Sequence, residues 1–129
     1  MDAAQALVEL TELSSQIRAA VVLGADGSLL GSTPGAPGSR AESLARATLE
    51  LIAAASELGP AHEVTRVEVE LEEGGLFVLR EDGRTIAATT GPQPTSGLVT
   101  YDLLTCLRAI DEQGPKRKRA PRKPKEGAE

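Results

Sequence analysis

The chain has 129 residues, a formal net charge of −5, and one tyrosine and one phenylalanine as its aromatic residues. Its length suits one domain, no apolar run reaches the ~18 residues of a membrane span, and one histidine with one cysteine cannot complete a zinc site of four side chains. A single cysteine excludes an internal disulfide, and the start Met-Asp-Ala-Ala lacks the features of a signal peptide, so we expect a cytoplasmic protein.

A helix followed by a short hairpin is predicted at the start of the chain. The helix covers residues 2–16, where apolar side chains recur every three or four residues. Its apolar positions are Ala3, Ala6, Leu7, Leu10, Leu13 and Ile17. Residues 19–23 and 28–30 predict two strands, and Asp26-Gly27 between them is typical of a tight turn. The glycines of residues 24–31 do not form a phosphate-binding loop, because the required Gly-Lys-Ser/Thr is absent and no helix follows directly.

The second predicted helix is more apolar than a helix lying on one sheet requires. Ser39, three residues before Glu42, matches a capping box, and Gly59-Pro60 ends the helix near Leu58. Either the helix is wedged deep in the core or a second surface covers its flank. We favour the second surface, because so short a chain has little with which to cover both sides. The helix residues that we assign to a homodimer interface are Leu44, Ala47, Leu51, Ala54, Ala55 and Leu58.

Three strands joined by hairpins are predicted next. Residues 64–72 alternate apolar and polar side chains, which indicates a strand with one buried and one solvent-facing side. Residues 76–80 and 85–90 predict the following strands, with turns at Glu73-Gly74-Gly75 and Asp82-Gly83.

A last helix begins near Thr95 or Ser96 and ends before Gly114-Pro115, with Leu98, Val99 and Leu103 on its apolar stripe. The element order is therefore α-β-β-α-β-β-β-α. Five strands joined largely by hairpins predict an antiparallel sheet, and three helices do not share one face comfortably. We therefore expect an α+β fold in which helices sandwich a five-stranded antiparallel sheet.

The pattern of elements resembles the roadblock / dynein light-chain family. The segments that carry the resemblance are IRAAVVLGADGSLLGST, VEVELEEGGLFVLREDGRTIAATT and the long helix between them, and the likeness covers residues 2–112. It implies a roadblock-like, profilin/longin-like fold that dimerises through the second helix and the edge strand after it, so that two sheets join into one. It also implies a non-enzymatic homodimeric adaptor that binds a small Ras-like GTPase or a related signalling protein.

The edge strand carries a row of charges with two explanations. Glu68, Glu70 and Glu72 deter unwanted pairing at a sheet edge. If the strand pairs antiparallel with its twin, identical carboxylates approach one another, and Arg66 can offset them. We predict that Arg66 lies near a glutamate of the neighbouring protomer, so Arg66, Glu68 and Glu70 complete the predicted interface.

No catalytic residue, metal ligand or cofactor site is predicted. The acidic pairs Glu72-Glu73 and Glu81-Asp82 flank hairpin turns, where solvated carboxylates are usual. His62 is interpreted as a surface histidine and Cys106 as a small buried apolar residue of the last helix. We therefore expect neither an enzyme nor a small-molecule substrate.

Charge is divided unevenly along the chain. Residues 1–115 carry seven arginines, no lysine and 17 acidic residues, whereas residues 116–129 carry seven basic and two acidic residues. This division predicts a folded domain over residues 1–113 and a disordered basic tail over residues 114–129. The tail cations are Lys116, Arg117, Lys118, Arg119, Arg122, Lys123 and Lys125.

The basic tail leaves several roles open. It can simply keep the protein soluble. It can also bind nucleic acid without sequence preference, an anionic membrane surface, or the acidic strand face of the domain itself. A nucleic-acid-associated module acting through the tail is therefore the alternative to the adaptor.

Overall fold

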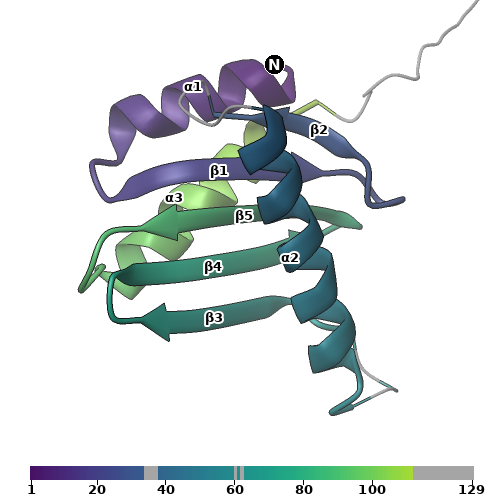
Figure 1. The fold of residues 1–129 in the computed structure, drawn as a ribbon. Coiled ribbons are helices and arrows are strands. Elements are labelled where there is room, and N and C mark those ends of the chain that lie inside the picture. Colours follow the sequence, from purple (N-terminus) through teal and green to yellow (C-terminus); the bar gives the residue numbers. More distant parts are fainter. Residues whose placement is uncertain (34–37, 60, 62, 112–129) are drawn as a thin grey trace, which may run out of the picture.

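Three helices and five strands follow one another in a computed structural model that describes residues 1–33, 38–59, 61 and 63–111 (Figure 1). In chain order they are α1 (Ala3–Leu13), β1 (Ile17–Leu23), β2 (Leu29–Ser32), α2 (Gly38–Ser56), β3 (Arg66–Leu71), β4 (Gly74–Glu81), β5 (Arg84–Thr90) and α3 (Ser96–Ala109). The predicted order α-β-β-α-β-β-β-α is confirmed.

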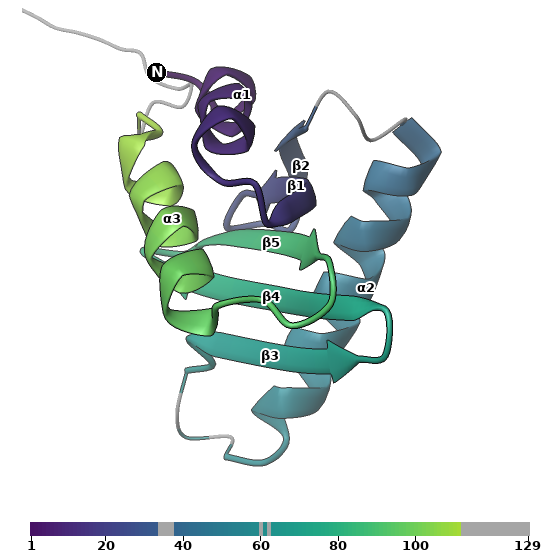
Figure 2. The same ribbon diagram turned by 90° about the vertical axis from the view of Figure 1, so that its left-hand side faces the viewer.

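The strands of the described chain form one antiparallel sheet in the order β2-β1-β5-β4-β3, so β2 and β3 are its edges. The pairing of β1 with β5, in which Ala20 lies opposite Ala88, joins the first hairpin to the later three strands. Helices α1 and α3 cover one face of the sheet, and α2 crosses the other (Figures 1 and 2). The predicted α+β sandwich is confirmed.

Alternation along the strands places one apolar cluster on each face of the sheet. Phe77 belongs to the cluster beneath α1 and α3, whereas Val78, the next residue, belongs to the cluster beneath α2. The buried residues that α2 contributes to its cluster are Ala41 and Ala45. Because alanine side chains bury little apolar area, α2 gains less stabilisation from the sheet than helices anchored by leucine.

The Asp26-Gly27 segment is a turn, as predicted. The Asp26 carboxylate accepts hydrogen bonds from the Ser28 N–H over 3.0 Å and from the Ser28 hydroxyl over 2.6 Å. These bonds to Ser28 lower the pKa of Asp26. Gly27 has a φ of 86°, a left-handed conformation that favours glycine. The polar groups of the segment are therefore used within the turn itself.

The turns that flank β4 differ in how well the sequence predicts them. Asp82 and Gly83 both have positive φ, at 55° and 81°, so the predicted tight turn is confirmed. The turn before β4 occupies residues 72–73, and Gly74 already belongs to the strand. A Cβ on Gly74 would collide with the backbone carbonyl oxygen of Thr90, so only glycine fits there.

Helix α1 is shorter than predicted. Ser14 is its C-cap with extended backbone angles, and the Ser14 N–H donates to the Leu10 carbonyl over 2.9 Å. Ile17 was placed on the helix stripe but lies in β1, where it is buried. Leu13 was also placed on that stripe, yet 76% of it is exposed, because it sits in the last turn beyond the part of α1 that packs on the sheet.

The ends of α2 also differ from the prediction. The helix begins at Gly38, one residue before the predicted N-cap Ser39. Its last regular residue is Ser56, and the Leu58 N–H then donates to the Ala55 carbonyl over 3.1 Å. A bond over three residues is typical of the tightened turn that ends many helices.

Candidate self-association interface

Helix α2 has three sides, and the sheet covers one of them. Ala41, Ala45 and Thr48 recur at helical spacing and are buried. Arg46 and Glu50 are exposed on the side that points away from the sheet. A third, apolar side runs along the helix between these two.

We call this third side the α2 stripe, and it contains the helix residues assigned to the dimer interface from the sequence. They are Leu44, Ala47, Leu51, Ala54, Ala55 and Leu58. Ala47, Ala54 and Leu58 are exposed, with Leu58 at 90%, and the other three are half-buried. No described residue of the chain covers the stripe completely, which is the arrangement expected of a surface that awaits a partner.

Strand β3 is an edge strand that pairs with β4 alone among the described strands. The Arg80 N–H donates to the Thr65 carbonyl over 2.9 Å, so Thr65 directs its carbonyl toward β4. Because these directions alternate in an antiparallel pair, Arg66, Glu68 and Glu70 direct their backbone N–H and carbonyl groups outward. This outward edge is able to pair with a further strand.

The side chains of β3 lie on two faces. Val67 packs against the cluster beneath α2, and Leu71 on the same face is 62% exposed. By alternation, the side chains of Arg66, Glu68 and Glu70 lie on the opposite face, which carries α1 and α3. The edge is thus apolar on the α2 side and charged on the other.

The charged face of β3 already contains contacts within the protomer. The Arg66 Nε lies 3.9 Å from Glu68 Oε1, and the Ser96 hydroxyl donates to Glu68 Oε2 over 2.8 Å. This ion pair and this hydrogen bond lie on the surface, since 56% of the Arg66 side chain and 37% of the Glu68 side chain are exposed. The contact of Arg66 with a glutamate of a neighbouring protomer stays a prediction.

The α2 stripe and the free edge of β3 form one surface. Figures 1 and 2 both show the C-terminal end of α2 extending past β3, so the later residues of the stripe lie beside that edge. Figure 1 also shows that α2 crosses the strands near one end and that no other helix of the described residues lies on the rest of this face. An apolar helix side, a free strand edge and an open sheet face therefore adjoin one another.

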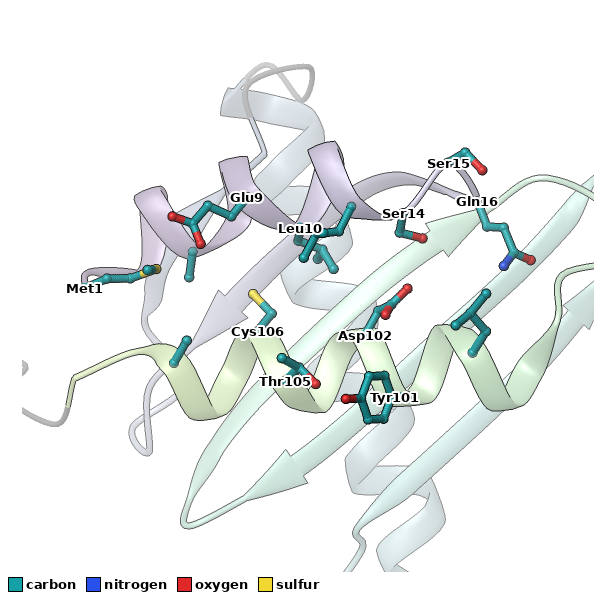
Figure 3. A pocket seen from close by; sticks show the side chains of 14 residues that line it. Met1, Glu9, Leu10, Ser14, Ser15, Gln16, Tyr101, Asp102, Thr105 and Cys106 are labelled. Carbon is teal, nitrogen blue, oxygen red and sulfur yellow. The ribbon is translucent and has the colours of Figure 1, made fainter.

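A second surface feature, not predicted from the sequence, is a groove between α1 and α3 (Figure 3). Its volume is about 390 Å³. Leu13 from α1 and Leu98 and Tyr101 from α3 line it, with exposed fractions of 76%, 50% and 67%. Leu98 was placed on the apolar stripe of its helix, and half of it is exposed in this groove.

Cys106 lies at the base of this groove and is buried, as predicted. Burial, with a smaller contribution from the Glu9 carboxylate, raises the pKa of the thiol to about 11. A thiol with this pKa is protonated at neutral pH and is a poor nucleophile.

We expected the acidic residues beside the Asp82-Gly83 turn to be solvated, but one of them, Glu81, is paired with an arginine. Arg108 of α3 donates to both carboxylate oxygens of Glu81, over 2.7 and 2.8 Å. This pairing with Arg108 lowers the pKa of Glu81. The bidentate contact joins α3 to β4, so Glu81 has a structural partner.

Some predicted residues lie outside the described part of the chain, namely His62 and the seven tail cations from Lys116 to Lys125. Within the ranges that the structure describes, no three His, Cys, Asp or Glu residues are grouped so as to hold a metal ion. In the same ranges, no helix has both the length and the apolar character to cross a membrane.

Comparison with known proteins gives one family and several related folds. A family model described as Roadblock/LC7 domain matches residues 3–91. The search of the curated proteins finds no match. A solved Roadblock/LC7 domain from Streptomyces avermitilis superposes with a TM-score of 0.75 and 21% identity, over 84% of this chain and 94% of that chain.

Two further solved structures share the fold at lower identity. MglB from Myxococcus xanthus has a TM-score of 0.67 and 17% identity, over 81% of this chain and 87% of that chain. A Loki profilin in complex with rabbit actin has a TM-score of 0.57 and 14% identity, over 81% of this chain and 92% of that chain. The predicted roadblock-like, profilin/longin-like fold is confirmed.

Proposed function

The chain belongs to the Roadblock/LC7 domain family, and we propose that it is a non-enzymatic, cytoplasmic homodimer that binds a small Ras-like GTPase or a related signalling protein. Family membership indicates an adaptor or regulator. The observation that carries the homodimer is the surface on which the apolar α2 stripe adjoins the free edge of β3. Burying such a surface between two copies would remove apolar side chains from water and satisfy the free backbone groups.

Backbone geometry limits how two β3 strands can pair. Arg66, Glu68 and Glu70 direct their backbone groups outward, so in an antiparallel pair these residues must lie opposite one another. About a twofold axis, two registers pair five residues of each strand. One has its axis at Glu68 and the other at Val69.

Charge favours the register with its axis at Glu68. In this register Arg66 of each copy faces Glu70 of the other, which gives two such pairs. Glu68 of one copy faces Glu68 of the other. In the register with its axis at Val69, Glu68 faces Glu70 of the second copy twice, with no arginine opposite either of them. Directly opposed like charges destabilise a strand pair, whereas opposed unlike charges stabilise it. We therefore assign the interface to the Arg66–Glu70 register, which also places Val67 opposite Val69 on the α2 side.

Two adjacent alanines of α2 provide a matched test. Ala54 belongs to the α2 stripe and Ala53 lies on the other flank of the helix, and both are exposed in the single subunit. Ala54→Glu would leave two uncompensated carboxylates in a dry interface at a cost of several kcal/mol. We expect it to dissociate the dimer, measured by sedimentation velocity, while Ala53→Glu leaves the dimer intact. Equal behaviour of the two variants would contradict the assignment of the stripe.

Partner binding is tested with the small Ras-like GTPases of the source cell, each loaded with GDP or with a non-hydrolysable GTP analogue. The proposal predicts that at least one of them binds the unmodified protein in calorimetry and that Ala54→Glu weakens this binding together with the dimer. A GTPase panel without any binder would remove the GTPase from the proposal while leaving the dimer open to its own test.

The uneven charge supports one alternative, a nucleic-acid-associated module that acts through residues 116–125. Seven tail cations can displace phosphate counterions, which predicts binding that is independent of sequence and falls steeply with salt. Under this alternative, replacing all seven with glutamine in the full chain would abolish nucleic-acid binding. Under the adaptor proposal, the same variant would keep both the dimer and GTPase binding.

A further inference from the structure

We propose that the groove between α1 and α3 binds the basic segment of the same chain, residues 116–125. The groove lies on the face of the sheet opposite α2, so this inference does not depend on the proposed dimer or on its partner. Residues 112–129 lie outside the described part of the chain. The argument therefore rests on the groove, on where the described chain ends, and on the sequence of the segment.

The described chain ends at the mouth of the groove. Met1 and Ala109 line this end, and the Asp111 N–H donates to the Met1 carbonyl over 2.9 Å (Figure 3). The five residues from Asp111 to Lys116 span at most ~17 Å when extended. Along α3, Asp102 lies only ~10 Å back from Ala109. The first tail cations can therefore reach the middle of the groove without any rearrangement of the domain.

The charge of the groove is complementary to that of the segment. Among the described residues, two carboxylates line the groove, Glu9 from α1 and Asp102 from α3, and no lysine or arginine does. Neither carboxylate has an ion-pair partner among the described residues. The ammonium group of Met1 also lies at the groove, where it is paired with Asp111. On the β3 face, by contrast, Glu68 is already engaged by Ser96 and Arg66. Of the two acidic surfaces, the groove is nearer to the start of the tail, and both of its carboxylates lack an ion-pair partner, whereas an arginine already lies in the acidic row of β3.

The apolar wall of the groove suits a segment rich in proline and arginine. The exposed ring of Tyr101 can receive an arginine guanidinium or a proline, and the aliphatic stems of lysine can cover Leu13 and Leu98. Two residues separate Pro121 from Pro124, the spacing found in proline-rich segments that dock on aromatic grooves.

A polar group on the groove wall also lacks a partner. Ser14 is 5% exposed, and its hydroxyl makes no hydrogen bond with any described residue. An unpaired buried hydroxyl is costly. Its oxygen is closed to solvent in this structure, so it is no partner for a segment that docks from outside.

The single tyrosine makes the proposal directly measurable. Tyr101 is the only tyrosine and the chain has no tryptophan, so intrinsic fluorescence reports on the groove alone. Acrylamide, a neutral quencher, measures how accessible the ring is. At low salt we expect the quenching constant of the full chain to be about half that of a full-length variant in which the seven tail cations are glutamine. Salt near 0.5 M should raise the constant of the unmodified chain to that of the variant, because the attraction is screened over a few ångströms.

Paired variants identify the acidic surface that holds the tail. The double change Glu9→Gln and Asp102→Asn should remove the protection of Tyr101, whereas Glu68→Gln with Glu70→Gln should retain it. The reverse result would place the tail on the β3 face and overturn the proposal. Equal quenching of the unmodified chain and the tail variant at low salt would overturn it as well.

A second measurement needs no substitution. Amide chemical shifts of the unmodified full chain, followed during a salt titration, should move mainly at the groove residues on α1 and α3. Shifts confined to β3, or absent from both regions, would contradict the docking of the tail in the groove.

Discussion

Reversal of the charges at Arg66 and Glu70 tests the proposed dimer at the level of single residue pairs. In the register with its axis at Glu68, Arg66 of each copy faces Glu70 of the other. Arg66→Glu therefore changes two attractive pairs into two repulsive pairs. The side chain of Arg66 is 56% exposed in the single subunit, so the substitution should disturb the fold of that subunit little.

The magnitude follows from the two symmetry-related pairs. With ~0.5 kcal/mol lost for each attractive cross-strand pair and a similar cost for each repulsive one, the dimer loses ~2 kcal/mol, or roughly 30-fold in its dissociation constant. Glu70→Arg alone should have a similar effect. The double variant restores both pairs and also keeps one arginine beside Glu68 on its own strand, so dimer affinity should return to near that of the unmodified protein.

The assay is sedimentation equilibrium over a dilution series, at low and at high salt, because screening should reduce the differences. The proposed register would be refuted if the double variant lost as much dimer affinity as the two single variants lose together. The combination Arg66→Glu with Glu68→Arg is the matched control. If that combination rescues the dimer instead, the axis lies at Val67 and the overlap of the strands is shorter.

Three further predictions concern the single subunit. Gly74→Ala should destabilise the fold by ~2–4 kcal/mol in urea denaturation, because its Cβ meets the Thr90 backbone carbonyl, and unchanged stability would show that β4 and β5 separate easily. Cys106 should react with iodoacetamide about a hundredfold more slowly in the native than in the unfolded protein at neutral pH. The reason is that its pKa is raised from 9.0 to about 11, and the reactive thiolate forms only as the pH rises through that value. Equal reaction rates would contradict the burial of Cys106. Because the pKa of Glu81 is lowered, its pair with Arg108 stabilises the fold above pH 4.5, and this stabilisation is lost as the pH falls below that value. Arg108→Ala should therefore reduce the dependence of unfolding on pH in the acid range. Parallel unfolding profiles of the two proteins would argue against the pair.

Features that depend on neighbours in the sequence were predicted well. The Asp82-Gly83 turn follows from residues that tolerate positive φ, and the alternation of Val67 and Glu68 follows from the two faces of a strand. The sandwich follows from the number of helices and from the hairpin spacing of the strands. Each of these inferences needs only local chemistry and the limited ways in which layers pack.

Features that depend on contacts between distant residues were missed. Glu81 and Arg108 are 27 positions apart, and nothing near either residue indicates the pair. The periodicity of α1 and α3 shows which sides are apolar, but it does not show how far each helix extends over its neighbour. Leu13 and Leu98 were therefore placed on the apolar stripes of their helices, and the groove in which they are exposed was not predicted.

The central claim is that two copies of the chain cover the α2 stripe and the β3 edge of one another. Sedimentation equilibrium of the unmodified protein at ~1 µM tests it most directly, because an interface of about 800 Å² per partner is the size at which specific complexes are stable. A folded species with twice the 13.4 kDa mass of the chain is the predicted result. A stable, folded species of 13.4 kDa at this concentration would contradict the claim.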